Sequence, residues 1–375
     1  MFSRVQTPCL ILDRKKFDRN IQRLKSVTKA SDLVIRPHLK TAKSRDVARI
    51  SASVFGHRAT VSTLKEIEQL IECGITDFLY SVSIVPRKLD RIAALLSTGC
   101  KVHVTVDNEK TASDLSRYCE EAGVKIPAII ELDLDGHRAG VNPSDHATLR
   151  AIGEILHEAG LLSGVMSHAG ESYGLSNNQA LLDCADDEAV RALQAAETLR
   201  KAGFECNVVS IGSTPTALVG RAHDGITELR AGVFMFFDLV QAGVGICSIN
   251  DIALSVLTSV IGKNPDTGAL IVDAGWMALS RDRGTANQAV DYGYGQVCLK
   301  DGTVLEDVIV TGAQQEHGII QVRKGSVAKL PDVEPGDLLR ILPNHACATA
   351  SAHDRYHVIS DRDNDIEIWE RFGGW

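Results

Sequence analysis

Two short stretches of the chain combine residue types that can do chemistry together. RPHLKTAKS (36–44) places Lys40 directly after a strand-like run, and the ε-amino group of a lysine can form an imine. SIGSTPT (210–216) is a turn between a strand-like run and a helix, and its backbone N–H groups and the hydroxyls of Ser213 and Thr214 suit a phosphate monoester. Together they indicate pyridoxal phosphate. Taken alone, the turn also fits an ordinary βα connection with a helix N-cap.

A second kind of chemistry is indicated by ILPNHACATA (341–350). His345 and Cys347 are two residues apart in a segment expected to be extended, so both side chains should face one side of a strand. Imidazole and thiolate are both good zinc ligands, and two protein ligands leave open positions for substrate or water. The alternative is a buried cysteine near a hydrogen-bonded histidine with no metal.

Further ionisable or hydroxyl side chains follow other strand-like runs. They are His38 and Lys43; Ser81 and Ser83; Asp133, Asp135, His137 and Arg138; His168 and Tyr173; and Glu228 and Arg230. In a barrel of parallel strands, reactive groups gather at the C-terminal ends of the strands. One charged residue at the start of a loop is usually a solvated charge, so the prediction of an active site rests on the whole set.

The elements that must position these residues alternate from about residue 30 to 245. Amphipathic stretches such as 62–74 and 108–123 end in a glycine, as helix C-termini often do. They alternate with eight short apolar runs, at 33–36, 57–61, 76–82, 101–107, 127–133, 162–168, 205–211 and 226–230. Eight such units predict an α/β fold, a (β/α)₈ barrel. The rival, a doubly wound open sheet, has only GVGIC (243–247) as a weak glycine signal.

After about residue 250 the pattern changes to strand-like runs separated by turn residues, with no convincing helix. This pattern predicts a second, all-β domain. We therefore expect a barrel domain over residues 1–247 and a β domain with the metal pair over 248–375. The N-terminal strand is a candidate for packing on the second domain.

Composition excludes several classes of protein. Hydrophobic residues make up 44% of the 375 residues, enough to build a core, so the chain is not mainly disordered. The net charge of −8 disfavours a nucleic-acid-binding protein. Nine cysteines without a repeating spacing suit a reducing cytoplasm better than a disulfide framework. No apolar run reaches the ~18 residues that span a bilayer, and the N-terminus is too polar for a signal peptide.

Eight motifs, in order along nearly the whole chain, resemble the D-serine dehydratase and D-threonine aldolase family. They are TPCLILD, RPHLKTAKS, ELDLDGHRAGV, SIGSTPT, ELRAGVFMFFD, VDAGWMALS, QEHG and LPNHACAT. Members of this family are fold-type III pyridoxal-phosphate enzymes with an alanine-racemase-like barrel. The stretches STPTAL and WMALSRDRG are most similar to the bacterial branch that dehydrates D-threo-3-hydroxyaspartate.

The resemblance implies roles for the barrel residues. Lys40 would bind pyridoxal phosphate covalently, and His168 would stand against the pyridine ring. The remaining cofactor contacts would come from Gly212, Ser213 and Thr214 at the phosphate, and from Arg138 and Tyr173 at the polar edge of the ring.

The resemblance also makes His345 and Cys347 the metal ligands. Dehydratases of the family pair His with Cys, whereas the aldolases usually pair His with Asp, so Cys347 favours a dehydratase and zinc. Mn²⁺, Mg²⁺ and Co²⁺ are the other candidate metals. One residue departs from the common pattern: Ala42 stands where the family usually has a second histidine, which puts transfer of aldolase or D-serine activity in doubt.

The activity implied is loss of water and then ammonia from a D-3-hydroxy amino acid, giving oxaloacetate from D-threo-3-hydroxyaspartate or pyruvate from D-serine. Lys40 would be the base at Cα, and Arg281, Arg283 and His317 are the candidate substrate-binding residues. The alternatives are a D-threonine aldolase, an amino-acid racemase and a non-catalytic cofactor-binding protein. The family usually forms homodimers, so we expect one here.

Overall fold

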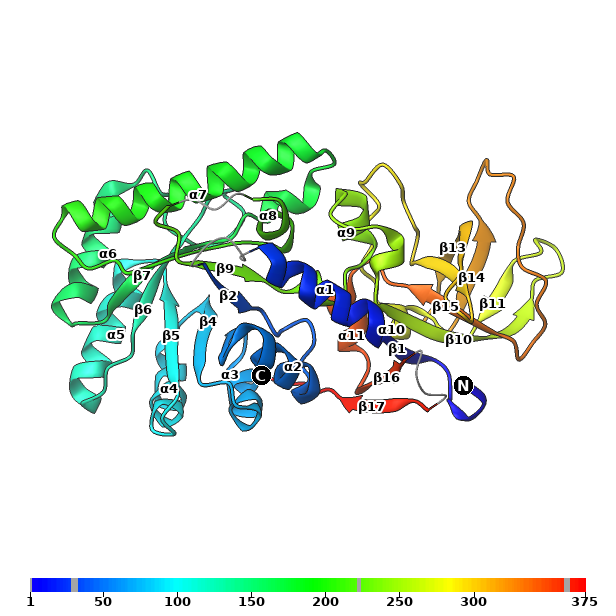
Figure 1. The fold of residues 1–375 in the computed structure, drawn as a ribbon, viewed down its shortest axis with the longest axis horizontal. Coiled ribbons are helices and arrows are strands. Elements are labelled where there is room, and N and C mark those ends of the chain that lie inside the picture. Colours follow the sequence, from blue (N-terminus) through cyan, green and yellow to red (C-terminus); the bar gives the residue numbers. More distant parts are fainter. Residues whose placement is uncertain (1, 28–32, 221–223, 361–364) are drawn as a thin grey trace. The chain divides into compact units, whose positions relative to one another are not determined.

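The protein was analysed as a computed structural model that describes residues 2–27, 33–220, 224–360 and 365–375. The chain forms two compact units (Figure 1). The barrel unit comprises 23–232 with the last two residues, and the β unit comprises 1–22 and 233–373. In the described residues, no helix is both long enough and apolar enough to cross a membrane.

The barrel unit is built on an eight-stranded parallel sheet, which confirms the predicted fold. Its order is β2-β9-β8-β7-β6-β5-β4-β3, and a single parallel bridge between His38 and Thr60 joins the two end strands. The strands are β2 (Val34–Pro37), β3 (Arg58–Val61), β4 (Asp77–Ser83), β5 (Lys101–Val106), β6 (Ala128–Leu132), β7 (Leu162–Ser167), β8 (Val208–Ile211) and β9 (Glu228–Ala231). Each overlaps one of the eight predicted runs.

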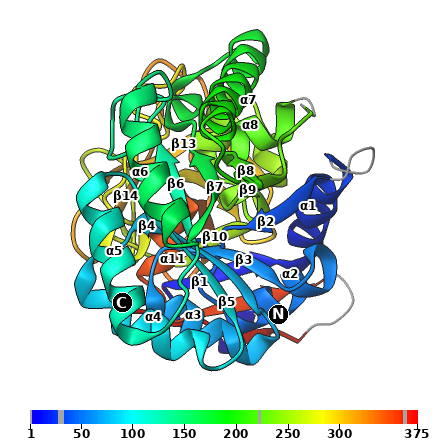
Figure 2. The same ribbon diagram turned by 90° about the vertical axis from the view of Figure 1, so that its left-hand side faces the viewer.

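Helices cover the outside of this sheet (Figure 2). They are α2 (Arg45–Phe55), α3 (Leu64–Leu70), α4 (Leu89–Leu96), α5 (Glu109–Ala122), α6 (His146–Glu158), α7 (Asn178–Lys201) and α8 (Thr214–Val219). Side-chain caps begin several of them: Asn108 accepts a hydrogen bond from the Thr111 N–H, and Asn177 from the Ala180 N–H. Gly123 takes the left-handed conformation after α5, as its place in the sequence predicted.

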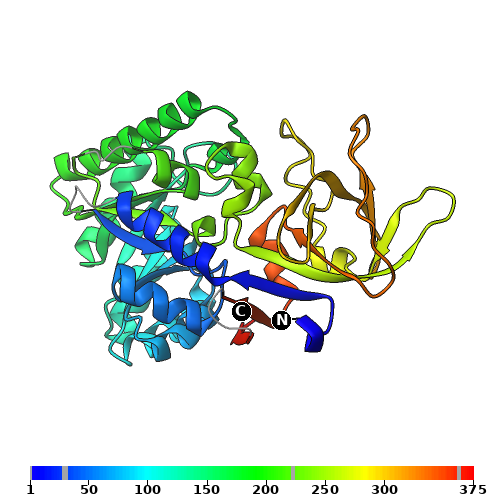
Figure 3. The same cartoon turned by 45° about the vertical axis from the view of Figure 1, so that its right-hand side comes forward.

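The β unit contains a nine-stranded sheet in the order β11-β14-β13-β12-β15-β10-β1-β16-β17. Figure 3 shows the blue β1 beside the long yellow-green β10, with which it pairs in antiparallel fashion. The N-terminal strand therefore belongs to this sheet. The strands are β1 (Cys9–Asp13), β10 (Leu254–Lys263), β11 (Leu270–Val272), β12 (Gln296–Leu299), β13 (Val304–Ala313), β14 (Gly318–Val322), β15 (Leu338–Leu342), β16 (Arg355–Ile359) and β17 (Glu367–Glu370).

The β unit also holds short helices, so the expectation of no helix after residue 250 is wrong. They are α10 (Trp276–Leu279) and α11 (Ala346–Ser351), while α9 (Leu239–Val244) precedes that point. Helices of one turn or little more are too short to show a 3.6-residue apolar period, so the sequence pattern did not reveal them. Helix α1 (Arg14–Val27) continues from β1, and its residues up to Gln22 belong to the β unit.

The division between the units falls after Gly232, earlier than the boundary at 247/248 that the sequence led us to expect. The segment after Gly232 is apolar and packs into the β unit. The ring of Phe236 lies 6.0 Å from that of Phe17 and 5.5 Å from that of Tyr356, and its carbonyl accepts a hydrogen bond from the Ala253 N–H at 2.8 Å. Such a fully buried aromatic side chain contributes roughly 2–3 kcal/mol of hydrophobic stabilisation to the unit that it joins.

Candidate active site

Lys40 lies in the turn that follows β2, where the sequence placed it. The backbone of this turn is fixed: the Leu39 N–H donates to the Thr60 carbonyl at 3.0 Å, and the Lys43 N–H donates to the Leu39 carbonyl at 2.9 Å. The side chain of Lys40 is exposed, whereas Lys43 lies 3.6 Å from the buried carboxylate of Glu66. Of these two lysines, Lys40 thus presents its amine at the barrel mouth.

Two histidines lie close enough to Lys40 for its charge to affect them. Burial, followed by the positive charges of Lys40 and Arg230, holds the pKa of His38 well below its usual range. His38 Nε2 lies 3.3 Å from the hydroxyls of both Ser62 and Ser81, and its buried Nδ1 has no hydrogen-bond partner among the described residues. His38 is therefore a neutral imidazole at the base of the Lys40 turn.

His168, at the end of β7, is held in one protonation state. Burial, with the nearby charges of Arg138 and Lys40, lowers its pKa to about 3, so it is neutral at physiological pH. Its Nδ1 lies 3.1 Å from the Gly212 carbonyl; since a carbonyl can only accept, Nδ1 carries the hydrogen and Nε2 does not. The Tyr173 ring lies 6.2 Å away, centroid to centroid. An oriented neutral imidazole of this kind fits a position against a cofactor ring.

Two backbone N–H groups of the turn after β8 already donate hydrogen bonds to other side chains of the protein. The Gly212 N–H donates to Glu188 Oε1 at 2.9 Å, and the Ser213 N–H donates to Thr216 Oγ1 at 3.0 Å. The sequence led us to expect that the backbone N–H groups of this turn would bind a phosphate, but these two already donate within the protein. Ser213 instead caps α8 through a reciprocal pair of hydrogen bonds with Thr216. The amide and hydroxyl of Thr214 remain as candidate phosphate donors.

Gly212 is required by close packing at this turn. Its φ is +126°, and a Cβ at this position would lie 2.3 Å from the carbonyl oxygen of Arg230. No other residue fits without moving β9. Together with the exposed amine of Lys40 and the neutral imidazole of His168, this close-packed turn fits pyridoxal phosphate.

Some charged residues of the loop after β6 form hydrogen bonds that shape the loop, and others are exposed to solvent. Asp133 and Asp135 accept hydrogen bonds from the backbone N–H groups of Gly136 and His137 and so shape the loop. Arg138 is exposed and lies near enough for its charge to help lower the pKa of His168. Of this group, Arg138 is thus the residue available to an anionic or hydrogen-bonding ligand.

Glu228 and Arg230 lie inside the barrel rather than at its open rim. They are two residues apart on β9, so both side chains point to the same face, and they are 5% and 4% exposed. Glu228 Oε2 pairs with Arg36 Nε at 2.6 Å, and Arg230 Nη1 donates to Ser210 Oγ at 2.7 Å. These contacts make both residues part of the buried polar network beneath the mouth.

His345 and Cys347 lie at the start of α11 in the β unit, so the predicted extended segment is wrong in part. His345 is the extended N-cap residue, and Cys347 is in the first turn of the helix. The three alanines of ACATAS favour a helix, and six residues are too few to show a helical period in the sequence. The two side chains still come together, since they hydrogen-bond to each other. Among the described residues no group of three or more metal-binding side chains occurs.

Asp282 contacts Nδ1 of His345, the histidine that the sequence predicts to bind a metal. Its Oδ2 lies 2.6 Å from His345 Nδ1, which leaves Nε2 for a metal. Burial lowers the pKa of His345, but the hydrogen bonds to Asp282 and Cys347 outweigh it and raise this pKa to about 11. Without metal the imidazole therefore carries a proton that a metal ion would displace. The residue types and the orientation of His345 fit a zinc ion.

Asp282 is not among the site residues that the sequence predicted, although both of its neighbours, Arg281 and Arg283, are. A signal was available: metal-binding histidines usually donate their other N–H to a carboxylate, and Asp282 lies in the SRDRG stretch already under consideration. Asp282 and His345 are 63 residues apart, so the sequence alone did not show that they pair.

A second carboxylate, the buried Asp238, fixes the helix that carries Cys347. Asp238 Oδ2 accepts a hydrogen bond from the Ala346 N–H at 2.9 Å, and its other oxygen accepts one from the Gln241 N–H at 3.0 Å. Burial raises the pKa of Asp238 to about 6, against the lowering effect of His345. Asp238 thus ties α9 to the first turn of α11.

The three candidate substrate-binding residues differ in the contacts that their side chains make within the protein. The Arg281 guanidinium lies 3.9 Å from the centre of the Trp276 ring, and no carboxylate pairs with it in the described part of the chain. Arg283 pairs with Asp291 at 2.8 Å. His317 is exposed in the turn between β13 and β14. Arg281 is therefore the arginine of this pair with a charge left for a ligand.

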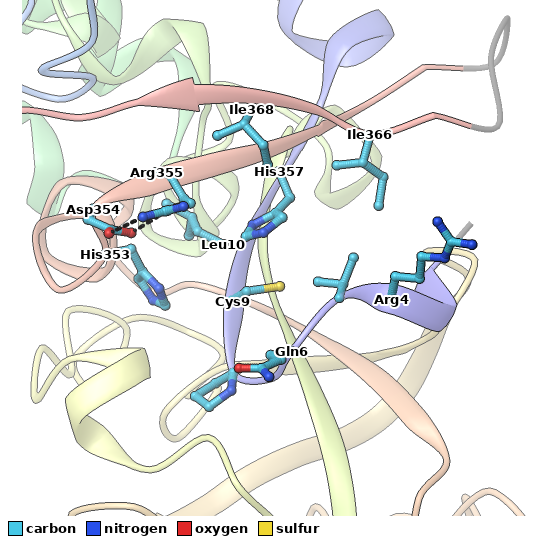
Figure 4. Close-up of a pocket in the computed structure, with 12 residues that line it drawn as sticks. Arg4, Gln6, Cys9, Leu10, His353, Asp354, Arg355, His357, Ile366 and Ile368 are labelled. Carbon is cyan, nitrogen blue, oxygen red and sulfur yellow. Dashed lines mark hydrogen bonds and ion pairs between the residues drawn. The ribbon is translucent and has the colours of Figure 1, made fainter.

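The β unit also has a pocket that contains none of the predicted site residues. Its volume is about 490 Å³, and it opens beside β1, β16 and β17 (Figure 4). Arg4, His353 and Arg355 line it, and Arg355 is already paired with Asp354 at 2.7 Å. The functional assignment therefore does not involve this pocket.

Asp282→Asn should weaken zinc binding by about 10- to 100-fold, because the amide oxygen is a poorer acceptor for the His345 N–H. Competition with a chromogenic chelator would measure the dissociation constant. Asp291→Asn is the matched control, since Asp291 pairs with Arg283 and not with His345. Equal zinc affinity in Asp282→Asn and the wild type would contradict the orienting role.

Two family models match the chain, one in each part of it. The alanine racemase N-terminal domain family matches residues 12–240, and the putative serine dehydratase domain family matches residues 253–359. The D-threo-3-hydroxyaspartate dehydratase of Delftia sp. (strain HT23) is 46% identical over 99% of this chain and 98% of that enzyme. The D-serine dehydratase of Dictyostelium discoideum is 28% identical, over 96% of this chain and 95% of that enzyme, and the D-threonine aldolase of Arthrobacter sp. is also 28% identical, over 98% and 92%.

Solved structures of the Delftia enzyme are also similar to this chain. The Delftia dehydratase has a TM-score of 0.96, with 46% identity and 99% of each chain covered. A cysteine-to-alanine mutant of that enzyme, solved in a metal-free form, has the same TM-score. The chain therefore belongs to the D-serine dehydratase and D-threonine aldolase family of pyridoxal-phosphate enzymes with the alanine-racemase fold.

Proposed function

We propose that the protein is a pyridoxal-phosphate- and zinc-dependent dehydratase that converts D-threo-3-hydroxyaspartate into oxaloacetate and ammonia. The observation that carries the proposal is the hydrogen-bonded pair of His345 and Cys347, oriented by Asp282, in a chain 46% identical to an enzyme of that name. A His–Cys pair is the dehydratase form of the metal site that the family resemblance implies.

The barrel residues would hold the cofactor and move the proton at Cα. Bound pyridoxal phosphate supplies an electron sink for the charge left at Cα. Lys40 would hold the cofactor and accept the proton from the substrate Cα. His168, neutral and fixed by the Gly212 carbonyl, would pack against the ring, with Arg138 and Tyr173 at its polar edge. Thr214, with the turn at Gly212 and Ser213, would hold the phosphate.

His345 and Cys347 would hold the divalent metal, which supplies Lewis acidity to the departing β-hydroxyl group. Imidazole and thiolate together favour zinc over the harder Mg²⁺ and Mn²⁺. Asp282 would keep the imidazole in the tautomer that presents Nε2. The position of the usual second histidine is taken by Ala42, which is fully buried, so an imidazole there would require its neighbours to move.

Arg281 is the residue that we assign to the second carboxylate of the substrate. Arg281→Met should raise KM for D-threo-3-hydroxyaspartate by about 10-fold or more, because a charge-assisted hydrogen bond is lost. KM for D-serine, which lacks the second carboxylate, should not change. Steady-state kinetics with both substrates measures the difference. Equal effects on the two substrates, or none on hydroxyaspartate, would refute the assignment.

The proposal is tested by ammonia release from D-threo-3-hydroxyaspartate, D-serine and D-threonine, each with added zinc or with a strong chelator. We expect the highest kcat/KM for hydroxyaspartate, and loss of activity in the chelator. A preference for D-threonine, with glycine and acetaldehyde as products, would support the aldolase alternative. Activity unaffected by chelation would remove the metal from the mechanism.

A further inference from the structure

Glu188 is a carboxyl group buried inside the barrel unit that none of the roles above uses. It lies on α7 and is 1% exposed. Its Oε1 accepts hydrogen bonds from the Gly212 N–H at 2.9 Å and from the Ser167 hydroxyl at 3.0 Å, and its Oε2 accepts one from the Thr216 hydroxyl at 2.8 Å. One carboxyl group thus joins the end of β7, the turn after β8 and helix α8.

These bonds determine which donors of the turn remain available. Because the Thr216 hydroxyl donates to Glu188, its oxygen is left to accept the Ser213 N–H at 3.0 Å. The Ser172 hydroxyl donates to the Ala169 carbonyl at 2.7 Å, so its oxygen accepts the Ser213 hydroxyl at 2.8 Å. The donors of Gly212 and Ser213 are therefore all committed to the protein, whereas the hydroxyl of Thr214 accepts the Gly232 N–H at 3.3 Å and keeps its own hydrogen for a ligand.

Electrostatics alone would disfavour a carboxyl group at this place, because a carboxylate behind a phosphate site repels the phosphate. The buried guanidinium of Arg230 lies close enough to interact with Glu188 and offsets part of this repulsion. Two of its three hydrogen bonds go to Gly212 and Thr216 in the turn 212–216, and the third goes to Ser167 at the end of β7. The positioning of this turn, rather than electrostatics, accounts for a carboxyl group at this place.

We propose that Glu188 is a positioning residue for the phosphate of the cofactor. It holds the turn 212–216 in the conformation that presents Thr214, before any cofactor arrives. The inference rests on the proposed placement of the phosphate at this turn. It makes a prediction opposite in sign to that of a simple charge effect: removing the negative charge of Glu188 weakens phosphate binding rather than strengthening it.

The test compares pyridoxal phosphate with pyridoxal, which forms the same bond with a lysine but has no phosphate. Cofactor-free protein is titrated with each compound. The dissociation constant of pyridoxal divided by that of pyridoxal phosphate measures how much the phosphate contributes to binding. In Glu188→Gln this ratio should fall about 10-fold, the effect of roughly one well-placed hydrogen bond, while the dissociation constant of pyridoxal itself stays unchanged. The ³¹P chemical shift of bound cofactor should also move toward that of free cofactor.

Two further variants keep the test decisive. Thr216→Val removes the bonds to Glu188 and Ser213 without altering a charge, and should lower the ratio as Glu188→Gln does. Glu197→Gln is the control on the same helix; Glu197 is exposed, pairs with Lys201, and should leave the ratio unchanged. A ratio equal to that of the wild type in both test variants, or a raised ratio in Glu188→Gln, would overturn the inference. A wild-type ratio near one would overturn the placement of the phosphate as well.

Discussion

Lys40→Ala is expected to abolish the visible absorption band that pyridoxal phosphate gains on binding to the protein, and to lower kcat by about 10⁴-fold or more. Lys40 is the exposed amine of its turn, and it would serve both as the anchor of the cofactor and as the base at Cα. Its loss therefore removes two functions at once. Absorption spectroscopy of the purified variant, mixed with excess cofactor, measures the first effect, and single-turnover kinetics measures the second.

Lys43→Ala is the matched control for this experiment. Lys43 lies in the same turn, but its amine is 3.6 Å from Glu66 rather than free. Removing it leaves the buried Glu66 without that partner and costs stability, yet the absorption band should remain. A band that persists in Lys40→Ala and disappears in Lys43→Ala would show that the anchoring lysine has been assigned wrongly.

Cys347→Ala should have the second-largest effect. It removes one of two protein ligands, so zinc affinity should fall by more than the roughly 10- to 100-fold expected for an outer residue such as Asp282. Ammonia release should fall with it, because the β-hydroxyl group is a poor leaving group without a Lewis acid. The cofactor absorption band should be unchanged, since Lys40 is intact. Metal content after dialysis and the dissociation constant for zinc measure the effect.

Cys184→Ala provides the comparison for Cys347→Ala. Cys184 is a partly buried free cysteine on α7, and the metal site does not include it. It should retain zinc and activity. If Cys347→Ala also retained stoichiometric zinc and wild-type ammonia release, the metal site would lie elsewhere and the dehydratase mechanism would need revision.

The sequence predicted the barrel well because its signals are local. Most barrel strands contain a short apolar run, as Ala128–Leu132 does, and helices such as α5 begin at a capping side chain and end at a left-handed glycine. These features depend on neighbours within a few residues. The short helix at Ala346–Ser351 was missed for the same reason: six residues are too few to show a helical period, and the two candidate metal ligands have the spacing of alternate positions on a strand.

The parts of the site that the sequence could not predict depend on contacts between distant residues. Glu188 is 24 residues from Gly212, and Asp282 is 63 residues from His345. Neither carries a motif of its own, and each acts by fixing a residue that does. In the same way, the sequence does not show that the amide of Gly212 is hydrogen-bonded, because its acceptor, Glu188, lies on helix α7.

The identity of the metal, the homodimer and the cytoplasmic location stay predictions. Metal analysis of protein purified without added metal would address the first, and light scattering of the purified protein would address the second.

The product formed from D-threo-3-hydroxyaspartate tests the central claim most directly. Dehydration releases the nitrogen and gives oxaloacetate and ammonia in equal amounts, whereas retro-aldol cleavage keeps the nitrogen and gives glycine and glyoxylate. Proton NMR of the reaction mixture, with ammonia measured in parallel, distinguishes the two. We predict oxaloacetate with one equivalent of ammonia and no glycine. Glycine and glyoxylate without ammonia would contradict the account.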